Sequence, residues 1–137
     1  MDNKTNELKI HMLKLAALID ASESLLPLIG DHAKYGGPPE NKVRSDSHDY
    51  LEIDKNGYHY VNIDRTKETD RLTTNDIDEL MYNVFLRVTS NMTSIHTRAL
   101  KNDMAERIQA FYTHQISLLE KLNTDWGERR RREIKNR

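Results

Sequence analysis

The chain of 137 residues contains no cysteine, which excludes disulfides, zinc–thiolate sites and cysteine nucleophiles. An excess of either charge is also lacking, because 21 basic and 22 acidic residues give a net charge of -1. No overall field therefore draws the chain to nucleic acid or to an anionic membrane. The longest apolar run, residues 15–19, is far too short to span a bilayer, and the charged N-terminus has no signal-type cleavage pattern. These absences predict a cytoplasmic protein without a membrane segment.

Recognisable catalytic patterns are missing as well. Nucleophile elbows, phosphate-binding loops and dinucleotide fingerprints do not occur, and no two of the six histidines stand three or four residues apart. Acid–base catalysis by Asp49 with Glu52 or Asp54 is an alternative, but it needs a closed, dry pocket of which a small sheet edge gives no sign. The chain is therefore predicted to be no enzyme and to carry no cofactor or metal. A metal site assembled from distant residues is the alternative.

Apolar residues at helical spacing mark the N-terminal part of the chain. The positions that recur at steps of three and four are Leu8, Met12, Leu15, Ala16 and Ile19. They predict a helix over about residues 6–19. Ser22 then favours one short turn over residues 23–26, which ends at a proline. Residues 29–46 are predicted to be a loop, because their Gly-Gly-Pro-Pro stretch suits neither a helix nor a central strand.

An alternating pattern follows and predicts a three-stranded antiparallel meander with one apolar face. The residues expected on that face are Leu51, Ile53, His59, Val61 and Ile63. A three-residue loop, Lys55-Asn56-Gly57, would place them there by pairing Ile53 with His59, and Gly57 would take the left-handed conformation of its third position. A two-residue turn at Asn56 and Gly57 would instead spread the aliphatic residues over both faces. We expect the three-residue loop, with Leu72 of the third strand beside Val61.

The other face of the predicted sheet is rich in tyrosine. Its members would be Tyr50, Glu52, Tyr58, Tyr60, Asn62, Arg71 and Thr73. Tyrosine and arginine dominate the energetic centres of protein interfaces, because each buries a large area and keeps a polar tip. This face is therefore either a docking surface for another protein or a surface that the N-terminal helix or the loop 29–46 covers.

The C-terminal half of the chain is predicted to form three helices. Asn75 is the expected cap of the first helix, with Asp76 and Asp78 placed favourably against its positive end. Its apolar residues are Ile77, Leu80, Met81, Val84, Phe85, Val88 and Met92. The second helix, over about residues 103–122, is expected to bury Met104, Ile108, Phe111, Tyr112, Gln115, Leu118 and Leu119. Helices before and after a meander make an α+β fold, predicted as a single domain over residues 1–137.

A last helix, capped by Asn123 or Thr124, is expected to carry Trp126 and then the arginines 129–132. Such a run suits phosphate contacts, which gives one alternative: a small nucleic-acid-associated regulatory protein. The other interpretation is a solvated helix whose arginine side chains interact favourably with the negative C-terminal end of the helix dipole. Around a helix the four arginines spread instead of forming one stripe, and Glu128 and Glu133 interrupt their charge. We therefore expect the solvated helix and do not expect nucleic-acid binding.

Several short motifs stand in a characteristic order: G-Y-H-Y-V from residue 57, R-L-T-T from residue 71, D-I-D-E-L-M-Y from residue 76, and W-G-E-R-R-R from residue 126. In this order and spacing, over roughly residues 15–134, the chain resembles the immunity protein 63 family of bacterial polymorphic toxin systems. The resemblance implies a protein without enzymatic activity that is made beside a secreted toxin. It would bind that toxin in the cytoplasm, by covering the active site or by locking an inactive conformation.

The resemblance also gives the tyrosine-rich face an expected partner. A cognate protein toxin, and no small-molecule substrate, is the partner that it implies. The residues then expected to contact the toxin are Tyr50, Glu52, Tyr58, Tyr60 and Arg71. No catalytic residue is implied for this chain.

Overall fold

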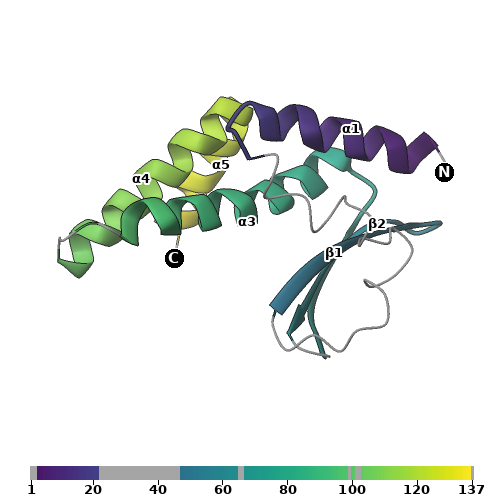
Figure 1. The fold of residues 1–137 in the computed structure, drawn as a ribbon, viewed down its shortest axis with the longest axis horizontal. Helices are drawn as coiled ribbons and strands as arrows, with labels where there is room; N and C mark the ends of the chain where they lie inside the picture. Colours follow the sequence, from purple (N-terminus) through teal and green to yellow (C-terminus); the bar gives the residue numbers. More distant parts are fainter. Residues whose placement is uncertain (1–2, 22–46, 65–66, 99, 101–102, 137) are drawn as a thin grey trace. The chain divides into compact units, whose positions relative to one another are not determined.

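The computed structural model describes residues 3–21, 47–64, 67–98, 100 and 103–136. In chain order they form a helix, a three-stranded antiparallel sheet and then helices (Figure 1), which confirms the predicted α+β class. The chain folds as two compact units, Met1–Val84 and Phe85–Arg137. The single domain expected for residues 1–137 stays a prediction. The turn expected at 23–26 and the loop expected at 29–46 lie outside the described residues.

Helix α1 spans Asn3–Ala17, close to the predicted helix over residues 6–19. Leu8, Met12 and Ala16 are fully buried along it, so the apolar stripe inferred from their spacing is confirmed. The helix ends where Asp20 takes a left-handed conformation, with a φ of 55°. There the N–H of Ala21 donates to the carbonyl of Ala16 at 2.8 Å, a bond that closes helix ends of this kind.

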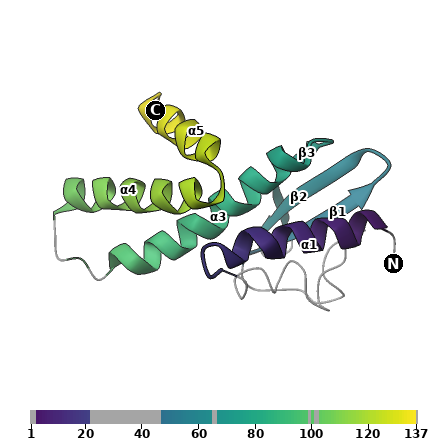
Figure 2. The same ribbon diagram turned by 90° about the horizontal axis from the view of Figure 1, so that it is seen from above.

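The sheet contains β1 (Ser47–Asp54), β2 (Gly57–Asp64) and β3 (Lys67–Thr74) in that order (Figure 2), so the predicted meander is confirmed. Its register is not the predicted one. Ile53 pairs with Tyr58, where His59 was expected, and Leu72 pairs with Tyr60, where Val61 was expected. Because side chains alternate, this shift by one residue changes which residues share a face.

The turn between β1 and β2 explains the shift. It contains two residues, Lys55 and Asn56, because Asp54 already pairs with Gly57. The carboxylate of Asp54 accepts the N–H of Asn56 at 2.8 Å, which closes the turn early. Gly57 opens β2 with a φ of 121°, and a Cβ there would lie 2.5 Å from Oδ1 of Asn75. Glycine is therefore needed at the start of β2, and not inside a three-residue loop.

Buried residues occur on both faces of the sheet. Tyr50 and Val61 form a pair on one face, and Leu51 and Tyr60 form a pair on the other. All four have exposed fractions of 6% or less. The expectation that the aliphatic residues share one face and the tyrosines the other is therefore wrong.

Helix α3 spans Ile77–Arg98 and contributes residues to both units. Its N-cap is Asp76, whose carboxylate accepts the N–H of Asp78 at 2.9 Å, and not Asn75 as predicted. The predicted apolar stripe is largely confirmed, because the fully buried side chains of α3 include Leu80, Met81, Val84 and Phe85. Among the described helices, none is both long and apolar enough to cross a membrane.

Helices α4 (Met104–Leu122) and α5 (Thr124–Lys135) complete the second unit. Figures 1 and 2 both show α4 beside the C-terminal part of α3. Asn123 caps α5 by accepting the N–H of Asp125, as one of the two predicted alternatives required. Trp126 is 4% exposed and stacks on Phe85 with ring centroids 6.4 Å apart. This pair lies in the apolar core of the unit.

The first two turns of α4 depart from the prediction. Gln115, Leu118 and Leu119 are buried as expected, but Met104 and Ile108 are 63% and 49% exposed. Both line a groove beside the end of α3 instead of the core. Helical spacing locates the apolar side of a helix, but it does not say how far along the helix a neighbour covers that side.

Candidate functional site

One face of the sheet gathers charged and hydrogen-bonding side chains from all three strands. Strand pairing places Glu52, His59 and Thr73 in one row and Tyr50, Val61 and Arg71 in the next. We call these six residues the Arg71 face.

Arg71 is the cation of this face and is paired with two carboxylates. Its guanidinium donates to both carboxylate oxygens of Glu68, at 2.8 and 3.2 Å, and its Nη1 lies 3.9 Å from Oε1 of Glu52. The hydrogen bond to Glu68 raises the pKa of Arg71 further above its ordinary range and lowers that of Glu68. Burial, followed by the charge of Glu52, raises the pKa of Tyr50. One-third of the Arg71 side chain stays exposed (33%), which leaves this cation accessible to a partner.

His59 links two strands through both of its ring nitrogens. Nε2 lies 2.8 Å from Oδ1 of Asp54, and Nδ1 lies 2.8 Å from the hydroxyl of Thr73. Because a carboxylate only accepts, the proton on Nε2 points to Asp54. This hydrogen bond, together with the N–H of Asn56, lowers the pKa of Asp54. His59 is 5% exposed. The hydrogen-bonded series Thr73–His59–Asp54 therefore joins β3, β2 and β1 through a buried imidazole.

Glu52, Asp54 and His59 form the one group, among the described residues, that could hold a metal ion. Their ligand atoms lie within 4.8 Å of one another. Two features oppose a cation here: His59 already bonds Asp54, and the positive charge of Arg71 lies beside Glu52. Sequence spacing missed the group because its members meet across a strand pair.

The opposite face of the sheet has a separate polar cluster around Asp49. Its carboxylate accepts the hydroxyl of Tyr60 at 2.7 Å and the amide of Asn62 at 2.6 Å. Asp49 therefore faces away from Glu52 and Asp54, and the acid–base combination considered from the sequence does not assemble. On the same face, the ammonium of Lys4 in α1 lies 4.7 Å from the ring centre of Tyr58, where burial raises the pKa of the tyrosine.

The structure therefore does not bring the five predicted contact residues together. Tyr50, Glu52 and Arg71 share the Arg71 face, whereas Tyr58 and Tyr60 lie on the opposite one. Tyr50 and Tyr60 are 3% and 6% exposed, so they have little area to offer a partner. The tyrosine-rich surface expected from the sequence is not formed, because it depended on the three-residue loop.

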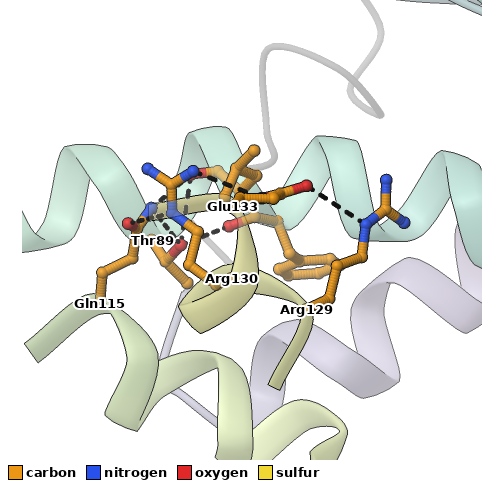
Figure 3. Close-up of polar contacts among 7 residues, drawn as sticks. Thr89, Gln115, Arg129, Arg130 and Glu133 are labelled. Atoms are coloured by element: carbon orange, nitrogen blue, oxygen red, sulfur yellow. Dashed lines mark hydrogen bonds and ion pairs between the residues drawn. The ribbon is translucent and has the colours of Figure 1, made fainter. Parts of the chain in front are cut away.

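Another polar cluster ties three helices of the second unit together. Figure 3 shows Gln115 of α4, Thr89 of α3 and Arg130 of α5 converging, with Glu133 beside them. The amide of Gln115 donates to the hydroxyl of Thr89 at 3.3 Å and to the carbonyl of Leu86 at 3.2 Å, and its oxygen accepts Nε of Arg130 at 3.0 Å. Gln115 is 1% exposed. A glutamine at a core position of an apolar helical pattern was the sequence signal for this cluster.

Arg129 and Arg131 of α5 are also engaged within the unit. Arg131 donates to Glu128 at 2.6 Å and to Glu120 at 2.5 Å, and Arg129 donates to Glu133 at 3.3 Å. The guanidinium of Arg130 lies 5.6 Å from the ring centre of Tyr112. Much of the charge of the arginine run is therefore neutralised by carboxylates of its own and the neighbouring helix, in agreement with the solvated-helix interpretation.

Comparison with known proteins assigns the family. The family model described as Immunity protein 63 matches residues 54–136, which is more than half of the chain and includes β2, β3 and the three later helices. Neither the curated proteins nor the solved structures gave a match. The resemblance seen in the short motifs is confirmed by this match, and the chain belongs to the immunity protein 63 family.

Proposed function

We propose that the chain is an immunity protein that binds and neutralises a cognate bacterial toxin in the cytoplasm of the producing cell. The observation that carries this proposal is the family match over residues 54–136. The protein acts by contact and needs no catalysis of its own. The hydrogen-bonded clusters around His59 and Gln115 favour a chain that is rigid before it binds, because networks of satisfied hydrogen bonds fix their side chains in advance.

The Arg71 face is one candidate contact surface, now reduced to its accessible members. Arg71 and Glu52 keep exposed fractions of 33% and 19% and lie on the same face. Alanine at Tyr50 or Tyr60 would damage the core and would not test binding, because both side chains are buried. The useful substitutions are therefore Arg71→Ala and Glu52→Ala, each with a melting curve to confirm folding.

A rescue assay tests the proposed function. The reading frame next to the gene is expressed in bacteria from an inducible promoter, with and without this chain. We expect growth only when both are present, and stoichiometric co-purification of the two polypeptides. Equal loss of viability in both cultures, under conditions where the chain is abundant, contradicts the proposal.

The nucleic-acid alternative makes a different prediction. Binding through the arginines would weaken steeply with salt and would disappear on removal of residues 129–137. The ion pairs of Arg129, Arg130 and Arg131 count against it, because phosphate would have to displace carboxylates already in place. A gel-shift titration with DNA and RNA at two salt concentrations distinguishes the two functions.

A further inference from the structure

A groove of about 430 Å³ opens in the second unit between the end of α3 and the first turns of α4. Its apolar lining comes from α4 and includes Met104, Ile108, Phe111 and Tyr112. Met104 and Ile108 are among the most exposed large apolar side chains of the described residues. Exposed apolar side chains grouped in a concave surface are typical of binding sites for another molecule.

The groove also has a consistent charge. Arg98 of α3 and Arg107 of α4 line it, and none of the described lining residues is acidic. Nε of Arg107 is buried and has no hydrogen-bond partner within the described part of the chain. A buried donor without an acceptor destabilises the free protein, which is the cost of holding the Arg107 side chain against the groove. Apolar lining with cationic side chains is complementary to an acidic segment that carries an apolar side chain.

We propose that this groove is a docking site for an acidic segment of the cognate toxin, an inference that rests on the proposed function. An apolar side chain of that segment lies against Met104 and Ile108, and a carboxylate accepts hydrogen bonds from Arg107. A second copy of this chain is the other occupant that the test must exclude.

The experiment measures binding of the full chain to the polypeptide encoded beside it, by calorimetry, for wild type and three variants. Ile108→Asp places a charge in the apolar lining, and Arg107→Gln removes a cation of the groove together with the unpaired Nε donor. Ile95→Asp is the matched control, because Ile95 is 67% exposed on α3 and does not line the groove. We expect roughly 30-fold weaker binding for Ile108→Asp and about 10-fold weaker binding for Arg107→Gln, with the control within about threefold of wild type.

A second readout separates docking from a structural role. Arg107→Gln removes the buried unpaired donor, so the free variant should unfold at the same urea concentration as wild type or a higher one while its affinity for the toxin falls. A structural role would lower stability and affinity together.

Each result has a defined meaning. A wild-type chain that does not bind the neighbouring polypeptide ends the proposed function and this inference with it. Wild-type binding that the groove variants share with Ile95→Asp overturns the groove alone. Self-association that Ile108→Asp abolishes, seen by light scattering without the toxin, assigns the groove to a second copy and also overturns the inference.

Discussion

Replacing Gln115 by leucine tests whether the polar cluster of Figure 3 stabilises the second unit. The side chain is 1% exposed and joins α4 to Leu86 and Thr89 on α3 and to Arg130 on α5. Leucine occupies a similar volume but supplies neither the acceptor for Arg130 nor the two donated hydrogen bonds.

The size of the effect follows from which groups lose their partners. A charged donor without its acceptor costs about 1.5–3 kcal/mol, and this cost is reduced because Arg130 keeps Glu133 at 3.4 Å. Thr89 keeps its own hydrogen bond to the carbonyl of Phe85 at 2.7 Å, so its loss is small. The lost hydrogen bond to the carbonyl of Leu86 costs about 1 kcal/mol more. Burial of the apolar leucine side chain stabilises the folded state by roughly 1 kcal/mol. We expect the free energy of unfolding to fall by about 2 kcal/mol.

Urea unfolding followed by the fluorescence of Trp126, the chain's single tryptophan, measures this loss inside the unit concerned. With a urea dependence of about 1–3 kcal/mol per molar, the midpoint should fall by roughly 1 M. Gln109→Leu is the control, because Gln109 is an exposed residue of the same helix and should change stability by less than about 0.5 kcal/mol.

A double-mutant cycle with Arg130→Met isolates the Gln115–Arg130 pair, for which we expect a coupling of about 1 kcal/mol. An unchanged midpoint for Gln115→Leu, or a coupling below about 0.5 kcal/mol, would refute the reasoning.

Three further changes test other parts of the structure. Gly57→Ala should destabilise the fold by about 1–3 kcal/mol, because its φ of 121° and the nearby Asn75 leave no room for a Cβ; urea unfolding beside the exposed turn variant Lys55→Ala checks this, and equal midpoints contradict it. Burial, His96 stacked at 4.0 Å and Lys121 lower the pKa of His114. The unfolded chain therefore binds a proton at His114 more readily than the folded chain, so stability should fall as the pH drops below about 6.5. The variant His114→Gln should flatten that dependence in thermal melts between about pH 7 and about pH 5. The hydrogen bond from His59 lowers the pKa of Asp54. The contribution of the Asp54 carboxylate to the free energy of unfolding is present above the ordinary carboxyl pKa of about 3.9 and is lost as the pH falls through the lower folded pKa. Asp54→Asn should therefore weaken the dependence of stability on acid pH. An NMR titration of Asp54 with an ordinary midpoint would contradict this.

Helices were predictable from this sequence because each repeats its apolar residues over several turns. The stripe of α3 from Leu80 to Val88 and the position of Trp126 in α5 follow from local spacing alone. The strand register was not predictable in the same way. Lys55-Asn56-Gly57 permits loops of different length, and the expectation that Val61 must share a face with Leu51 failed because both faces bury residues.

The same distinction applies to the candidate sites. Gln115 was expected in the core, but its partner Arg130 lies fifteen residues away on another helix, and only the packing of α4 against α5 reveals the pair. The group Glu52, Asp54 and His59 depends on the register of the hairpin. The groove depends on how far α3 covers α4, which the exposure of Met104 and Ile108 shows and helical periodicity does not.

The two-residue turn at Lys55 and Asn56 gives the sheet an evolutionary property. Gly57 fixes β2 against the end of β3. A codon gained or lost in the turn would therefore move every side chain of β1, and of β1 alone, to the other face of the sheet. Leu51 and Ile53 would then replace Tyr50 and Glu52 beside Arg71, although no amino acid of either strand had been substituted. A single insertion or deletion can thus exchange a charged surface for an aliphatic one in one step.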